Sequence, residues 1–211
     1  MISIGREQST TSIVYRHGTP EDIGMIVRLH IAAFPGFFLT SLGRSFLRLL
    51  YRAFLDVEGG ICIVAQDDHG VQGVVVGTVD PSSFFATLRR KRGIFFALAA
   101  LPGVFRNPLL VIRKCLWALS YRGEQPGALP GAGLLSSVAV APEVSGRGIG
   151  QRLMGVFCET LRLHSTEYVY LITDETDNER VNGFYRKCGF ALVDTFERFE
   201  KRRMNRWAKR L

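Results

Sequence analysis

Two hydrophobic periods alternate along the chain. Short runs rich in valine, isoleucine and tyrosine are typical of β-strands, whereas longer segments repeat apolar residues every three or four positions, as amphipathic helices do. Strands are predicted at residues 12–16, 61–65, 71–79, 134–140, 168–173 and 191–196. Helices are predicted at residues 19–33, 40–55 and 178–189, and in the segment that ends near residue 164. The mixture predicts an α/β (α+β) fold.

Local signals mark the ends of several elements. Thr19 is a candidate N-cap with Pro20 at the first helical position, and Pro35 with Gly36 should end that helix. Residues 67–70 join two strand-like runs and predict a hairpin. At 211 residues and 47% hydrophobic composition the chain can bury one sizeable core, so we expect a single domain over residues 1–211.

A glycine-rich turn follows the strand at 134–140 and opens a helix. Gly146, Gly148 and Gly150 would let a ligand approach the backbone, and the unpaired N–H groups of the first helical turn favour a phosphate. No Gly-Lys-Ser/Thr follows, which excludes a nucleotide P-loop, and the glycines lack the spacing of dinucleotide-binding turns. The turn therefore indicates a phosphate ligand of a third class.

The pattern Val140-x-Pro142-x-x-Ser145-x-x-Gly148-x-Gly150 resembles the pyrophosphate-binding turn of the GNAT superfamily of CoA-dependent N-acetyltransferases. The family usually has Gln or Arg where this chain has Ser145, so Arg147 or Arg152 could supply the cation. The resemblance implies a mixed, mostly antiparallel twisted sheet flanked by helices, and acetyl-CoA as cosubstrate. The CoA-binding residues it implies are Val138, Val140, Ser145, Gly146, Arg147, Gly148, Ile149, Gly150, Gln151, Asn178 and Tyr185.

A second segment supports the same family. Residues 178–190 resemble its Asn-x-x-Ala-x-x-Phe-Tyr-x-x-x-Gly-Phe pattern, with Val181 where alanine is common. Asn178 and Tyr185 are two helical turns apart and should share a helix face, and Gly189 should end the helix. Asn178 would orient the cofactor or simply cap the helix. Tyr185 would cap the CoA pocket or act catalytically.

The resemblance implies direct transfer of an acetyl group to a primary amine, with the pantetheine arm along residues 134–140 and a gap between that strand and the strand at 168–173. A tyrosine is protonated at pH 7, so Tyr185 suits the role of general acid toward the departing thiolate. The base that deprotonates the amine is left open between a water chain and five polar residues. These are His30, Asp80, Ser136, Ser137 and Asp174.

Residues 81–128 form an unusually long connection after the third strand. The stretch 81–123 contains no Asp or Glu and eight Lys or Arg residues, which equals the net charge of +8 for the whole chain. With Pro102-Gly103 as a break, the pattern predicts two or three short helices. We favour a lid packed on the core over an anionic membrane contact, and nucleic acid is the less favoured partner. The basic residues 198–211 could complete a last hairpin or form an exposed arm.

Scattered cysteines without metal-binding spacing, no apolar leader and no run long enough to span a bilayer predict a reduced, cytoplasmic, metal-free protein. Three hypotheses stay open: an N-acetyltransferase, an acyltransferase for a longer acyl donor, and a membrane-surface or nucleic-acid binding module on the same scaffold. The acceptor, a small-molecule or protein amine, is not identified by the sequence. Nor is a possible homodimer.

Overall fold

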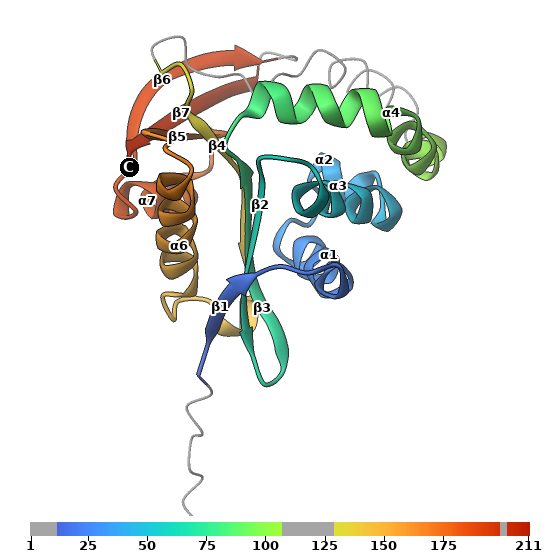
Figure 1. The fold of residues 1–211 in the computed structure, drawn as a ribbon, viewed down its shortest axis with the longest axis horizontal. Helices are drawn as coiled ribbons and strands as arrows, with labels where there is room; N and C mark the ends of the chain where they lie inside the picture. The colour runs from blue at the N-terminus through green and yellow to red at the C-terminus, as the bar shows by residue number, and fades with distance from the viewer. Residues whose placement is uncertain (1–11, 107–128, 199–201) are drawn as a thin grey trace, which may run out of the picture.

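The computed structural model describes residues 12–106, 129–198 and 202–211, with side chains described to residue 101 in the first range. Within these ranges, seven strands form one sheet in the order β1-β2-β3-β4-β5-β7-β6 (Figure 1). All neighbours pair antiparallel except β4 and β5, which are parallel. The predicted mixed, mostly antiparallel sheet flanked by helices is confirmed. The strands are β1 (Val14–His17), β2 (Gly60–Asp67), β3 (Gly70–Thr78), β4 (Gly133–Val140), β5 (Tyr168–Asp174), β6 (Ala191–Arg198) and β7 (Arg202–Arg210).

Helices cover both faces of the sheet (Figure 1). On one face lie α1 (Ile23–Ala33), α2 (Phe38–Ser41), α3 (Arg44–Asp56) and α4 (Pro81–Arg106), and on the other α6 (Ile149–Leu163) and α7 (Glu179–Lys187). The central strands serve both layers because successive side chains point to opposite faces. On β3, Val74 and Val76 pack with α1 and α3, while Val75 packs with α6. This explains why β3 reads as a continuous apolar run rather than an alternating one.

Strands β4 and β5 pair over only two residues. Gly133 and Leu134 lie opposite Val169 and Tyr170, and no later residue of either strand pairs with the other. On its outer edge β4 pairs with β3 over most of its length, and β5 pairs with β7 throughout. The two strands therefore part within the sheet, as the family resemblance implied. Beside this gap, β4 carries a bulge in which Ser136 has no partner on β3.

One helical prediction was wrong in detail. The helix predicted at residues 40–55 is two helices, α2 and α3, because Gly43 between them has a φ of 92° that ordinary residues avoid. The predicted cap at Thr19 is confirmed, with Pro20 at the first helical position. The helix there opens with a short 3-10 turn (Pro20–Asp22), and α1 follows and ends at Ala33 as expected. The first strand lies at Val14–His17 rather than residues 12–16.

The insertion also differs from its prediction. Instead of a helix broken at Pro102, α4 runs for 26 residues through that position to Arg106. A proline inside a helix lacks the N–H for one hydrogen bond and its ring crowds the carbonyl four residues earlier, so the helix continues only where packing offsets this cost. Packing supplies that support for α4, because Ala100 is buried against Leu42. The rest of the predicted insertion, residues 107–128, lies outside the described residues.

At the C-terminus the structure has the hairpin rather than an arm. Strand β7 lies between β5 and β6 and pairs antiparallel with both. Its Trp207 is 2% exposed and belongs to the core beneath α6. The middle of this interior strand is largely buried, and its exposed basic residues lie at the two ends.

Candidate functional site

The glycine turn connects β4 to α6 through a 3-10 turn (Pro142–Val144). Gly146 and Gly148 have φ angles of 85° and 79°, in the left-handed region. A Cβ at either position would meet no atom within 4 Å, so both glycines are required by backbone conformation and not by packing. Gly148 is the N-cap of α6, and the N–H groups of the first helical turn have no acceptor within the helix. The turn therefore presents backbone N–H groups beside open space, an arrangement compatible with the phosphate ligand expected from the sequence.

Gly150 also has a packing role. A Cβ there would lie 3.3 Å from the ring of Phe184, on α7. The missing side chain lets α7 pack against the start of α6, so the two segments recognised in the sequence are in direct contact. From the spacing of the glycines in the sequence, Gly150 was predicted only as one of the residues that bind phosphate.

A cation that the sequence did not single out contacts Ser145. Arg180, at the start of α7, donates a hydrogen bond of 3.4 Å to the Ser145 hydroxyl. Arg147 is exposed on the turn itself, whereas Arg152 acts electrostatically on Tyr15 of β1. Arg180 lies one turn before Phe184 on the helix that contacts the glycine turn, a neighbourhood that only the fold reveals.

Asparagines attach α7 to β5. The Asn178 side-chain amide donates to the Asp174 carbonyl at 3.2 Å, which supports the predicted orienting role toward the helix. The second asparagine was missed: Asn182 is 4% exposed and its amide oxygen accepts a 2.8 Å hydrogen bond from Thr173. Thr173 in turn accepts a 2.9 Å bond from the indole of Trp207. The sequence could have indicated Asn182 by its spacing, because it lies four residues after Asn178 and on the same helix face.

Tyr185 lies in the core between α6, α7 and the parting strands. It is 7% exposed and belongs to the same apolar cluster as Leu171, with Val138 and Val140 of β4 at its margin. Burial raises the pKa of Tyr185 above its ordinary value, so the hydroxyl stays protonated at neutral pH. The structure thus brings together Tyr185 and the predicted β4 residues.

Two of the five candidate bases are engaged elsewhere. Asp80 accepts hydrogen bonds from the Ser82 hydroxyl and the Ser83 N–H, and so caps α4. Asp174 is paired with Arg202 through both carboxylate oxygens. Both carboxylates therefore already have polar partners in this structure.

The other three candidates lie near the gap or connect to it. Ser136 is the bulged, exposed residue of β4, and Ser137 lies close enough to Tyr51 of α3 to oppose the rise in pKa that burial gives the Tyr51 hydroxyl. The Tyr51 hydroxyl and His30 Nδ1 share a hydrogen bond of 2.8 Å inside the core. His30 Nε2 is buried without a partner, and burial lowers the pKa of His30 to about 4. A neutral chain of three side chains therefore links α1 through α3 to β4.

The sequence profile of the acetyltransferase (GNAT) family matches residues 24–190. This range spans most of the chain and includes both the glycine turn and the segment at residues 178–190. The chain belongs to the GNAT acetyltransferase family. The resemblance inferred from residues 140–150 and 178–190 is thereby confirmed, and with it the expectation of an acetyltransferase. Acetyl transfer from acetyl-CoA is the general reaction of this family.

Solved structures share this fold at low sequence identity. SsHAT superposes with a TM-score of 0.69 at 18% identity, over 94% of this chain and 98% of its own. The ribosomal-protein-alanine N-acetyltransferase of Brucella melitensis gives 0.60 at 15% identity, covering 94% and 99%. An aminoglycoside 6'-N-acetyltransferase in complex with coenzyme A gives 0.60 at 13% identity, covering 93% and 96%. No curated protein sequence matches the chain significantly.

Proposed function

We propose that this protein transfers an acetyl group from acetyl-CoA to a primary amine by direct transfer, with both reactants bound in the gap between β4 and β5. The observation that carries the proposal is the junction of three features. The free N–H groups of the glycine turn, the unpaired edge of β4 and the protonated Tyr185 converge on the place where the sheet opens.

The residues present fit a CoA diphosphate and its arm. The turn from Ser145 to Gln151 supplies backbone donors, and Arg180 and Arg147 supply positive charge for the diphosphate. Beyond Leu134, the edge of β4 that faces β5 pairs with no described strand. Its open N–H and C=O groups, at Val138 and Val140 among others, suit the amides of the pantetheine arm. Acetyl-CoA would supply the activated acetyl group.

Tyr185 is assigned the general acid. As the amine nitrogen bonds to the acetyl carbon and the C–S bond breaks, Tyr185 donates its hydroxyl proton to the departing sulfur, and the amine loses a proton to a base. Although burial raises the pKa of Tyr185, a buried thiolate becomes more basic as well. In this protein burial raises the pKa of the Cys62 thiol to about 12. Burial therefore raises the pKa of both the proton donor and the leaving thiol, so their difference changes less than either value alone.

His30 is better suited to hold the site than to act as its base. A pKa of about 4 makes His30 a weak proton acceptor at pH 7. Its link through Tyr51 fixes Ser137, the residue next to the bulge, and so the shape of β4 at the gap. We propose that water near Ser136, the exposed bulge residue, takes the proton from the amine.

Binding is tested by isothermal titration of acetyl-CoA against the wild type and two matched variants. Gly148→Val forces a β-branched residue into a left-handed N-cap, whereas Gly155→Val places the same side chain on the exposed face of α6, where a Cβ meets no atom within 4 Å. We expect Gly148→Val to weaken binding at least tenfold, about 1.4 kcal/mol, and Gly155→Val to leave it unchanged. An unresponsive wild type, or equal losses in both variants, would refute the site.

Catalysis is tested separately with Tyr185→Phe. We expect kcat to fall by roughly 10²–10⁴ while acetyl-CoA affinity is kept, because the ring remains and only the proton is lost. Release of free CoA is followed with a panel of amines that includes an aminoglycoside and peptides with free N-termini, the acceptors named for two similar structures. If Tyr185→Phe keeps the full rate on an accepted amine, Tyr185 is not the acid.

A further inference from the structure

The outer face of α4 carries a stripe of large apolar side chains. Ile94, Phe95, Leu98 and Leu101 are 70%, 56%, 58% and 45% exposed. Ile94, Leu98 and Leu101 recur at helical spacing and share one face, and Phe95 lies beside them. A contiguous exposed patch of this kind, unlike scattered single apolar residues, marks a surface that binds something.

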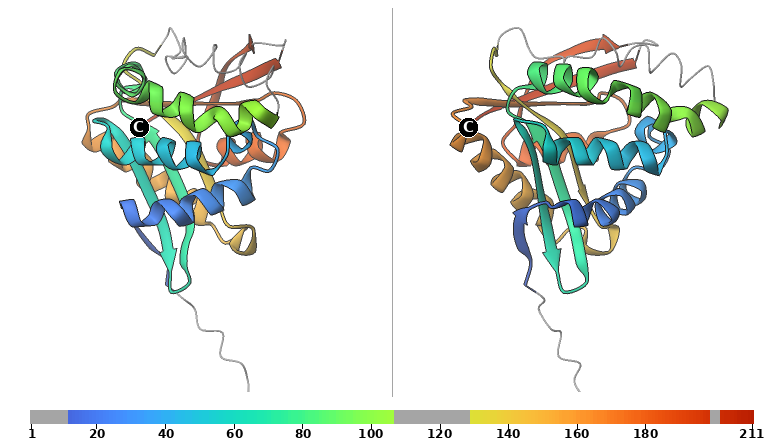
Figure 2. Two further views of the ribbon diagram at one scale, coloured as in Figure 1. Left: turned by 90° about the vertical axis from the view of Figure 1, so that its right-hand side faces the viewer. Right: turned by 45° about the vertical axis from the view of Figure 1, so that its right-hand side comes forward.

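The stripe contributes nothing to holding α4 in place. The opposite face of α4 packs on α3, where the Phe84 ring stacks on Phe54 at 4.9 Å and the Phe96 ring meets Phe46 at 5.0 Å. In Figure 2, α4 runs alongside α3 on the side away from α1. The helix is therefore anchored by its inner face, and its outer face is left to solvent.

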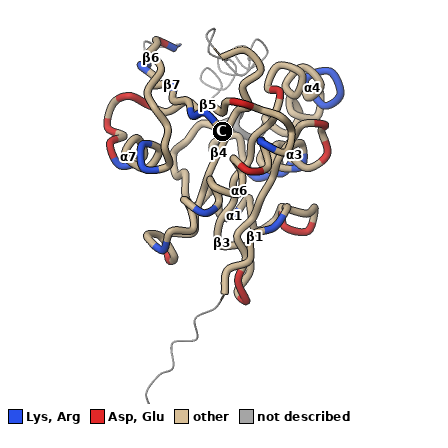
Figure 3. The backbone as a smooth tube through the Cα atoms, turned by 60° about the vertical axis from the view of Figure 1, so that its left-hand side comes forward, with Lys and Arg blue, Asp and Glu red and all other residues tan. Residues whose placement is uncertain are grey.

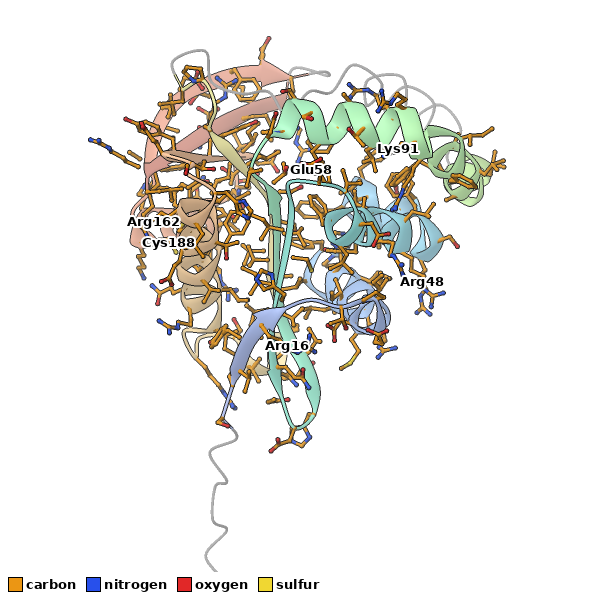
Figure 4. The ribbon with its side chains drawn as sticks, viewed as in Figure 1. Arg16, Arg48, Glu58, Lys91, Arg162 and Cys188 are labelled. Atoms are coloured by element: carbon orange, nitrogen blue, oxygen red, sulfur yellow. The ribbon has the colours of Figure 1, made fainter. Side chains whose placement is uncertain are left out.

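Positive charge accompanies the stripe. Arg90 and Lys91 are exposed one turn before Ile94, and α4 contains no acidic residue (Figure 3). Lys91 is labelled on α4 in Figure 4. By contrast Arg92, toward the inner side, is paired with Asp56 at 2.9 Å. The exposed face thus combines cations with apolar side chains, the combination by which helices lie in the interface of anionic bilayers.

We propose that the outer face of α4 docks the protein onto an anionic lipid membrane, with the helix lying parallel to the surface. Among the described residues no helix combines the length and hydropathy needed to span the bilayer, so the contact is peripheral. Ile94, Leu98 and Leu101 enter the acyl boundary while Arg90 and Lys91 meet the phosphate headgroups.

Two other occupants fit this face less well. A nucleic acid would be held by many cations and by stacking rings, whereas the described side chains of this face are mainly aliphatic, with Phe95 as the exposed ring among them. A second copy of the chain would bring another net charge of +8 and an α4 without acidic residues to pair with these cations. The charge and the apolar surface together favour lipid.

The test is co-flotation of the full chain with vesicles. Phosphatidylcholine vesicles are compared with vesicles containing about one third phosphatidylglycerol, at about 0.1 M and about 0.5 M salt. We expect retention on the anionic vesicles, weaker at the higher salt. Ile94→Ser and Leu98→Ser should each lower the partition coefficient roughly tenfold, and Arg90→Glu with Lys91→Glu should abolish the preference for anionic lipid.

Leu163→Ser is the matched control, because Leu163 is 83% exposed on α6, at the opposite face of the sheet. It should partition as the wild type does. All of these side chains are exposed, so the variants should keep the wild-type circular dichroism and melting temperature. The proposal is overturned if anionic vesicles do not retain the protein, or if Leu163→Ser loses as much binding as Leu98→Ser. It is also overturned if the α4 variants abolish DNA binding or dimer formation instead.

Discussion

The buried His30 predicts that acid destabilises this protein in a specific pH window. His30 is 4% exposed, and burial lowers its pKa from 6.5 to about 4. In the unfolded chain the imidazole takes up a proton below about pH 6.5, whereas in the folded protein it does so only near pH 4. The stability that depends on a neutral His30 is therefore fully present above pH 6.5 and is lost as the pH falls toward 4. Between pH 7 and pH 4.5 the loss is on the order of 2 kcal/mol.

Urea denaturation at these two pH values measures the loss. His30→Gln removes the titration while keeping a side chain that can hydrogen-bond Tyr51, so its stability should fall by about 2 kcal/mol less than that of the wild type. His69→Gln, at an exposed histidine, should behave as the wild type. Arg16 lowers the pKa of the Asp22 carboxyl, so protonation of Asp22 in acid also lowers the free energy of unfolding. This loss is the same in every variant and cancels when the variants are compared.

A second readout is independent of how well the variant folds. In the NMR spectrum of the folded wild type, the His30 imidazole signals should not titrate between about pH 7 and about pH 5. The reasoning is refuted if those signals titrate near pH 6.5. Equal acid losses in the wild type and His30→Gln would refute it as well.

Two further predictions concern packing and surface charge. Gly77→Ala would push a Cβ into the Leu134 carbonyl and the Phe157 ring, so the free energy of unfolding should fall by about 3 kcal/mol or more; a melting temperature near that of the wild type would contradict the close approach of β3 and β4. Asp56→Asn removes the pairing of Arg52 and Arg92 on the surface, and should cost less than about 1 kcal/mol, with a still smaller difference at high salt. A salt-independent loss above that limit would mean that Asp56 is needed for packing.

Much of the fold follows from local pattern. Apolar periods located the strands and the main helices, and the glycine spacing located a turn whose Gly146 and Gly148 do need left-handed backbone. These features could be predicted because each is specified by residues close together in sequence. The same local view misjudged two breaks. A helix break was predicted at Pro102, where α4 continues, and none was predicted at Gly43, whose unusual φ separates α2 from α3.

Contacts between distant segments could not be read from the sequence. Gly150 looks like a ligand-binding glycine, and its contact with Phe184 exists only because α7 folds back against α6. Arg180 reaches Ser145 for the same reason. Tyr51 reads as one more residue of an amphipathic helix, and only the meeting of α1, α3 and β4 shows that it connects His30 to Ser137.

These long-range contacts explain how the gap between β4 and β5 is held open. On the β4 side, Ser137 is tied to Tyr51, and so to the layer formed by α1 and α3. On the β5 side, Thr173 is tied to Asn182 of α7 and to Trp207 of β7, in the opposite half of the molecule.

Each strand contacts its own layer at the height where it no longer pairs with the other, β4 through Ser137 beside Tyr51 and β5 through the hydrogen bond of Thr173. Breaking the buried bond between Thr173 and Asn182 to close the gap would cost about 1–3 kcal/mol for each polar group left without a partner. These contacts favour a sheet with an open edge in its centre. The proposed binding site would then need no rearrangement to admit an extended ligand.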